Sequence, residues 1–247
     1  MENWQSRTEL LLGSEGLERL KTSHVMIAGL GGVGSWAAEF VCRAGVGKIS
    51  IIDHDVVKPS NRNRQLPALL STEGQKKTDV MAQRLRDINP QIILNTSDIF
   101  LRDDATKELI LKLNPDFIID AIDTLSPKVF LIHFAVTNNF KIVSSMGAGG
   151  RIDPTQIEIA DISKSKNCRL AYFIRKRLRK LGVCKGFDVV FSRELADEDA
   201  IVSVKDESNK KSTVGTISYL PAVFGAFCAS VALRHLTAND IKKTTPV

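Results

Sequence analysis

Short apolar runs alternate with amphipathic segments along the first 145 residues of the chain. Five stretches have the aliphatic, β-branched character of buried strands: residues 25–28, 48–53, 91–96, 116–120 and 141–145. Four stretches between them carry apolar positions at helical spacing: residues 35–44, 76–88, 103–113 and 127–138. Strands separated by helices of this length predict right-handed crossovers and a parallel sheet.

The pattern changes in the second part of the chain. Residues 151–162 alternate weakly around an Asp-Pro turn and predict a hairpin added to the sheet, while 169–181 predict a basic helix and 186–192 another strand. The polar stretch 193–213 predicts a mobile loop, and 218–236 predicts an apolar closing helix.

The fold class predicted from these elements is α/β. We expect a Rossmann-like, doubly wound, mostly parallel sheet with helices on both faces and an added antiparallel portion. No composition shift marks a linker, so we expect a single domain over residues 1–247. Within it, residues 1–146 form the nucleotide-binding half and residues 147–247 the substrate-binding and dimer half.

Composition limits the classes of protein to which the chain can belong. Hydrophobic residues make up 43% of the chain, and the net charge of +6 permits nucleic acid as a partner. The longest apolar stretch, residues 216–233, contains Pro221 and is interpreted as a buried helix, so no transmembrane segment is expected. The cysteines form no CxxC pair, so no zinc ribbon is expected. Few cysteines and no export signal at the N-terminus predict a cytoplasmic location.

A glycine-rich turn is the first candidate for chemistry. Gly29, Gly31, Gly32 and Gly34 follow a predicted strand and open a predicted helix. Without Cβ atoms the backbone turns tightly and approaches phosphate, and the helix N-terminus supplies N–H donors. Asp53 ends the next strand 19 residues later, at the position typical of a carboxylate on ribose hydroxyls.

The residues after this strand distinguish nucleotide cleavage from hydride transfer. Asp55 is either a turn-stabilising residue or a direct participant. Asn61, Arg64, Gln65 and Lys77 add cations and amides that a triphosphate would contact, and that a dehydrogenase does not need. Both cations would neutralise charge that develops as pyrophosphate leaves. Lys76 competes with Lys77, because only one of two neighbours on a helix faces the site.

Two aspartates close the fourth predicted strand. Asp123 is expected to reach the carboxyl edge of the sheet, where Mg²⁺ would bridge it to phosphates. Asp120 is interpreted as a cap for its strand. Lys128, at the start of the next helix, faces either this pocket or the solvent.

A basic block follows in the second half. Residues 164–185 hold nine Lys or Arg and no acid, a pattern suited to phosphate backbones or to a solvated helix face. Tyr172 and Phe173 lie within this block. We expect them either to stack on a base or to pack the helix against the rest of the protein. Cys168 and Cys184 are interpreted as buried or incidental thiols.

These motifs resemble the ubiquitin-activating (E1-like) superfamily of adenylating enzymes. The similarity rests on Gly-Leu-Gly-Gly-Val-Gly, Asp-His-Asp, Asn-Arg-Asn-Arg-Gln, Lys77 and Ala-Ile-Asp, in that order and spacing. Within the superfamily the chain is most similar to the tRNA threonylcarbamoyladenosine dehydratase family. This second similarity covers almost the whole chain, from Ser6-Arg7-Thr-Glu-Leu-Leu-Leu-Gly through Gly147-Ala-Gly-Gly-Arg-Ile-Asp-Pro-Thr-Gln to Ser218-Tyr-Leu-Pro.

The resemblance implies an enzyme that uses Mg-ATP to cyclise N6-threonylcarbamoyladenosine at tRNA position 37, through adenylation of its carboxylate. It implies that Asp53 holds ribose, that Arg64 and Lys77 hold phosphate, and that Asp123 serves the metal. It further implies a homodimer in which Arg7 reaches the neighbouring subunit's triphosphate. A monovalent cation (Na⁺ or K⁺) and a cysteine desulfurase with its sulfur-acceptor protein are also implied.

Three other functions fit part of the sequence. Adenylation of the C-terminus of a ubiquitin-like sulfur-carrier protein needs the same site, but such relatives carry the paired CxxC motifs absent here. An NAD(P)-dependent oxidoreductase would use the glycine turn and Asp53, but leaves Arg64 and Lys77 without a role. A non-catalytic tRNA-binding scaffold would not need the complete set of phosphate-contacting residues.

Overall fold

The computed structural model describes residues 3–203 and 212–237. Its principal helices are α1 Ser6–Thr22, α2 Gly34–Ala44, α3 Lys77–Ile88, α4 Asp103–Leu113, α5 Leu125–Thr137, α6 Arg169–Lys180 and α7 Tyr219–Leu236. Its strands are β1 His24–Ala28, β2 Lys48–Ile52, β3 Ile93–Ser97, β4 Phe117–Asp120, β5 Ile142–Ser145, β6 Ile157–Asp161, β7 Asp188–Ser192, β8 Ile201–Ser203 and β9 Ser212–Val214.

Seven strands form one sheet in the order β3-β2-β1-β4-β5-β7-β6. All neighbours are parallel except β6, which runs antiparallel to β7 with Ile159 opposite Val190. The order reverses between β1 and β4, and the carboxyl ends of these two strands therefore flank the crevice in which such sheets bind ligands. The predicted fold class is confirmed.

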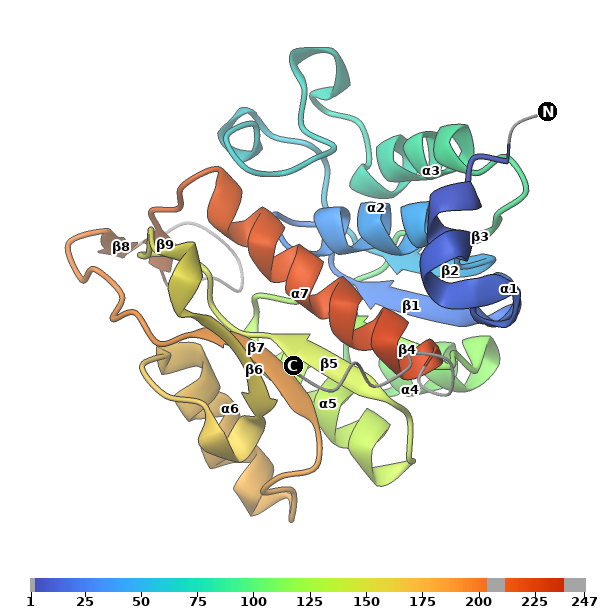
Figure 1. Ribbon diagram of the computed structural model, residues 1–247. Helices are drawn as coiled ribbons and strands as arrows, with labels where there is room; N and C mark the ends of the chain where they lie inside the picture. Colours follow the sequence, from blue (N-terminus) through green and yellow to red (C-terminus); the bar gives the residue numbers. More distant parts are fainter. Residues whose placement is uncertain (1–2, 204–211, 238–247) are drawn as a thin grey trace, which may run out of the picture.

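Helices cover both faces of the sheet (Figure 1). Apolar side chains of α1, α2, α3 and α7 pack against one face, and those of α4, α5 and α6 pack against the other. The apolar helix α7 is long enough to cross a membrane by length and composition, with a mean hydropathy of 1.3. In the structure it lies on the sheet beside α2 and buries Leu220, Phe224 and Cys228 in the core. This arrangement agrees with its interpretation as a core helix.

The antiparallel portion differs from the predicted hairpin. Residues 151–162 contain one strand, β6, and its partner β7 follows only after α6. The Asp-Pro pair does not form a hairpin turn. Asp153 instead accepts a hydrogen bond from the Thr155 N–H, at 2.8 Å, and starts the single 3-10 turn Pro154–Gln156 that leads into β6.

Regular structure occurs within the segment predicted as a mobile loop. β8 and β9 pair antiparallel, with Ile201 opposite Val214. This small sheet is joined to the glycine-rich segment after β5, because Gly150 N donates to Gly215 O at 2.8 Å. Residues 204–211 of the predicted loop lie outside the described residues.

Candidate nucleotide-binding and catalytic site

The glycine turn between β1 and α2 is closely packed. Gly29 has φ +92°, and a Cβ there would lie 2.9 Å from the Ala121 carbonyl oxygen. A Cβ on Gly34 would lie 1.8 Å from the carbonyl oxygen of Gly29. Both positions therefore require glycine. Val33 at the N-cap of α2 supplies no side-chain acceptor, and the Ser35 N–H donates to Gly31 O at 3.2 Å. No capping side chain therefore competes with an anion at the start of this helix.

Asp53 links this turn to the end of β2. One carboxylate oxygen accepts the Leu30 N–H at 2.6 Å, and the other accepts the Asp55 N–H at 2.8 Å. The side chain is thus held beside the glycine turn. Because each carboxylate oxygen has a further lone pair, the group can still accept from a ribose hydroxyl.

Lys77 and Lys76 have different environments. Lys77 is buried, and its Nζ lies 2.9 Å from Asp55 Oδ2. Lys76 is exposed and pairs instead with Asp98, at 2.6 Å. The structure therefore places Lys77 at the sheet edge, and it gives Asp55 the role of fixing this ammonium group.

Arg64 lies between the glycine turn and the end of β4. A Cβ added to Gly32 would lie 3.3 Å from the Arg64 Cγ. The same Cβ would also lie close to Pro221, at the start of α7. Arg64 Nη1 donates to Ser60 O at 2.9 Å. Partial burial lowers the pKa of Arg64, and the charge of nearby Asp123 opposes that shift. An Arg remains protonated in proteins, so the group supplies a partly desolvated positive charge near a carboxylate.

The amides at this loop have separate functions. Asn61 is buried, and its Oδ1 accepts the Lys58 N–H at 3.1 Å, which shapes the loop that carries Arg64. Gln65 is also buried. Its Nε2 would lie 4.0 Å from a Cβ added to Gly31. Its Oε1 has no hydrogen-bond partner among the described residues. A buried acceptor without a partner beside the glycine turn favours a bound ligand that donates to it.

Asp123 is exposed in the loop from β4 to α5. The backbone just before it is fixed, because Lys128 Nζ donates to Ile122 O at 2.9 Å. Lys128 faces neither the pocket nor the solvent, contrary to both expectations. It forms a fully buried ion pair with Asp120, at 2.8 Å, and Ser144 Oγ donates to the same carboxylate. The sequence did not indicate this burial, because a lysine in the first turn of a helix is typical of the protein surface.

Arg7 is apart from these residues in the single chain. It is exposed on α1, which Figure 1 shows at the end of the sheet opposite the glycine turn. α1 bends at Gly13, which has φ 76° and ψ 168°.

Another residue that sequence reasoning missed is Arg151. This buried guanidinium donates to four backbone carbonyls, those of Gly147, Gly149, Asn167 and Glu194. It joins the segment after β5 to the start of α6 and the end of β7. The only indication of this role in the sequence was the position of Arg151 directly after a cluster of glycines.

Two of the cysteines, Cys42 and Cys228, are not activated thiols. Cys168 is buried at the N-cap of α6, and burial raises the pKa of both Cys42 and Cys228 to about 12. Cys184 is exposed, and all four are free. A high pKa keeps a thiol protonated and unreactive.

The basic helix α6 buries Ala171, Ile174 and Leu178 and exposes most of its cations. It packs against α5, where Arg177 Nη1 donates to Ser126 Oγ at 2.7 Å. Ser126 lies three residues after Asp123, so this positive surface adjoins the candidate site.

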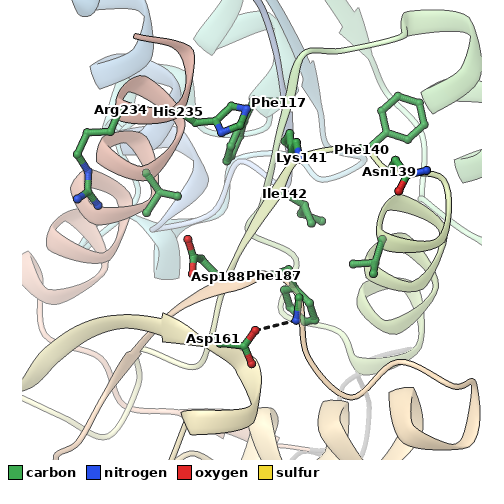
Figure 2. Close-up of a pocket in the computed structure, with 13 residues that line it drawn as sticks. Phe117, Asn139, Phe140, Lys141, Ile142, Asp161, Phe187, Asp188, Arg234 and His235 are labelled. Carbon is green, nitrogen blue, oxygen red and sulfur yellow. Dashed lines mark hydrogen bonds between the residues drawn. The ribbon is translucent and has the colours of Figure 1, made fainter. Parts of the chain in front are cut away.

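A hollow of about 510 Å³ lies at the opposite edge of the sheet (Figure 2). Lys141 and Asp188, at the amino ends of β5 and β7, line it together with Arg234 and His235 of α7. Asp161 accepts the Gly186 N–H there at 2.7 Å. Parallel sheets bind nucleotides at the carboxyl ends of their strands, so this hollow is not the nucleotide site.

Known proteins share this architecture. The tRNA threonylcarbamoyladenosine dehydratase of Bacillus subtilis is 43% identical over 230 residues, which cover 92% of this chain and 89% of that protein. The Escherichia coli enzyme of the same name is 36% identical over 260 residues, 97% of each chain. Its crystal structure in complex with ATP matches with a TM-score of 0.87, again over 97% of each chain.

The family model called ThiF matches residues 5–246. These similarities confirm the resemblance to E1-like adenylating enzymes and to tRNA threonylcarbamoyladenosine dehydratases. With a glycine turn, a strand-end aspartate and a buried lysine assembled at one sheet edge, and nearly its whole length matched, the chain belongs to the ThiF family.

Proposed function

We propose that the protein catalyses the ATP-dependent cyclisation of N6-threonylcarbamoyladenosine at position 37 of tRNA. The observation that carries this proposal is the nearly full-length similarity to dehydratases of that name, one of them solved with ATP. The edge of the sheet that binds ATP in this proposal holds the glycine turn, Asp53, Arg64 and Lys77. The whole chain then acts as one adenylation domain in the cytoplasm, with nucleotide bound by residues 1–146 and substrate by 147–247.

The reaction has two steps. The substrate carboxylate attacks the α-phosphorus of ATP, and pyrophosphate leaves. A nitrogen or oxygen of the carbamoyl group then attacks the acyl carbon of the resulting anhydride, and AMP leaves with the former carboxylate oxygen. The net change in the nucleoside is the loss of one water. Asp53 binds ribose, the turn around Gly31 and Gly32 binds phosphate, and Arg64 and Lys77 neutralise charge on the leaving pyrophosphate.

We place Mg²⁺ at Asp123. A second group of ligand atoms, on Asp53, His54 and Asp55, lies within 4.8 Å of one another. The ammonium of Lys77 already pairs with Asp55, and both oxygens of Asp53 accept backbone N–H groups, so a cation is less favoured there. At Asp123 the metal would offset phosphate charge. On the resemblance alone we add a monovalent cation (Na⁺ or K⁺) and a cysteine desulfurase with its sulfur-acceptor protein.

A homodimer completes the proposed site. Leu10 and Leu11 on α1 are 87% and 83% exposed, an unusual state for two adjacent leucines. Arg7 lies on the same helical stretch. In the proposed dimer these leucines pack against the partner, and Arg7 contacts the triphosphate bound there.

The test uses purified protein, Mg-ATP and tRNA that carries N6-threonylcarbamoyladenosine. We expect AMP and pyrophosphate in equal amounts and, after digestion, a nucleoside lighter by one water in mass spectrometry. AMP release that depends on a ubiquitin-like carrier protein instead of tRNA would assign the chain to carrier activation. Tight NADH binding without ATP binding would refute adenylation altogether.

A further inference from the structure

Two adjacent aromatic side chains on α6 are exposed. Tyr172 is 53% exposed and Phe173 is 36% exposed, while the helix is anchored by Ala171, Ile174 and Leu178. The two rings meet edge to face, 5.3 Å apart. Other residues of the helix therefore anchor it to the sheet, and part of the apolar area of the pair is in contact with water.

Positive charge surrounds the two rings. The guanidinium carbon of Arg169 lies 5.9 Å from the centre of the Phe173 ring. Lys166, Lys176 and Arg177 are also exposed on this part of the chain, and residues 164–185 contain no acid to compensate them. Exposed aromatic rings among cations suit a polyanion with flat apolar faces, which describes unpaired RNA.

The start of the helix that carries the aromatic pair is fixed at the same edge of the sheet as the candidate active site. Cys168, which begins α6, has its Sγ 3.8 Å from the position of a Cβ on Gly147, just after β5. Arg151 holds both Gly147 and Asn167 through their carbonyl oxygens. The first turn of α6 thus lies at the carboxyl edge of the sheet, the edge that carries the glycine turn and Asp123.

We propose that Tyr172 and Phe173, with Arg169, form a stacking platform for an unpaired nucleotide next to the nucleoside that is modified. This inference rests on tRNA being the substrate. A base stacked on the platform, with its phosphates on the neighbouring cations, would hold the reacting nucleoside toward Asp123. Every base has a π-face, so the platform orients the RNA loop without reading its sequence.

The test compares alanine and aromatic replacements in steady-state kinetics with tRNA that carries N6-threonylcarbamoyladenosine. Phe173→Ala and Tyr172→Ala should each raise the KM for tRNA roughly tenfold, the lower range for loss of one stacked base. Phe173→Trp and Tyr172→Phe should keep it within about twofold. Leu181→Ala, an exposed apolar position just after the same helix, is the matched control and should change nothing.

Salt dependence separates stacking from phosphate contact. The alanine variants should keep the wild-type slope of log affinity against log salt, because they remove no phosphate contact. Lys166→Glu with Lys176→Glu, which reverse two of the neighbouring cations, should flatten the slope. ATP affinity should stay unchanged in all variants, which also verifies their folding.

The outcomes distinguish the platform from the proposed function. If wild-type protein does not convert tRNA, the proposed function fails. If it does convert tRNA and Phe173→Ala and Tyr172→Ala match it in KM, the platform is wrong. Equal KM increases for Phe173→Ala and Phe173→Trp would also overturn stacking.

Discussion

Lys128 Nζ lies 2.8 Å from Asp120 Oδ2, and both side chains are completely buried beneath the candidate active site. The same ammonium group donates to Ile122 O, while Asp120 Oδ1 accepts the Ile122 N–H at 3.1 Å. Together, the two members of the ion pair therefore hold both backbone polar groups of Ile122, the residue that precedes Asp123. Ser144, on the adjacent strand β5, donates to Asp120 at 2.6 Å and ties the pair to the sheet.

Removing one charge of this pair should be costly. Lys128→Met leaves Asp120 as an uncompensated buried carboxylate, and we expect a loss of about 3–5 kcal/mol in the free energy of unfolding. The double variant Lys128→Met with Asp120→Asn should lose less than the sum of the single variants, because the unpaired charge is gone. Urea unfolding of the four proteins measures this coupling, and strict additivity would show that the pair is not coupled.

The adjacent lysines provide a matched comparison for ATP binding. Lys77→Ala should weaken ATP binding at least tenfold, about 1.4 kcal/mol, because a buried phosphate-side charge is lost. Lys76→Ala should change it by less than about twofold, since this side chain is exposed and its pair with Asp98 contributes little. Isothermal titration calorimetry measures both. Similar effects of the two substitutions would contradict the assignment of Lys77.

The proposed sharing of the site between subunits can be tested by mixing two variants, each expected to be inactive alone. Arg7→Ala disables the contribution to the partner, and Lys77→Ala disables the chain's own site. After subunit exchange, a mixed dimer holds one site with neither defect, so activity should return to about a quarter of wild type for random pairing at equal amounts. Exchange is verified by native mass spectrometry. Exchange without recovered activity would argue against Arg7 acting in trans.

His24 should make stability depend on pH. It is buried with its ring 2.8 Å from Ser50 Oγ, and burial, assisted by the charge of Lys48, lowers the pKa of His24 from 6.5 to about 4. Between these values the unfolded chain binds a proton that the folded chain does not. The contribution is therefore fully present above pH 6.5 and is lost as the pH falls toward 4, by about 3 kcal/mol.

Urea unfolding between pH 7 and pH 4 would measure this loss. His24→Asn should flatten the pH dependence in this range. The pKa of His235 is lowered too, mainly by burial, and contributes a loss of the same sign in both proteins. An identical pH dependence for His24→Asn and wild type would exclude His24 as the source.

Sequence reasoning located the parallel strands and their helices within a few residues, because apolar periodicity and glycine turns are local signals. It could not choose between Lys76 and Lys77, since this depends on the rotation of α3 about its axis. It missed the burial of Lys128, because a cation at a helix start is typical of the surface. The pairing of β6 with β7 was also missed: the two strands are separated by α6, and only long-range packing sets their register.

The position of α7 has a consequence for how the protein folds during synthesis. α7 covers the same face of the sheet as α2, and one apolar core extends from Leu20 to Ala232. A ribosome-bound chain that ends near residue 146 has made the strands around the glycine turn, but it still exposes the face of α2 against which α7 will pack. N-terminal segments usually fold first when they form complete domains. Here we expect folding to wait until α7 emerges, so that the ATP site forms only when the chain is almost finished.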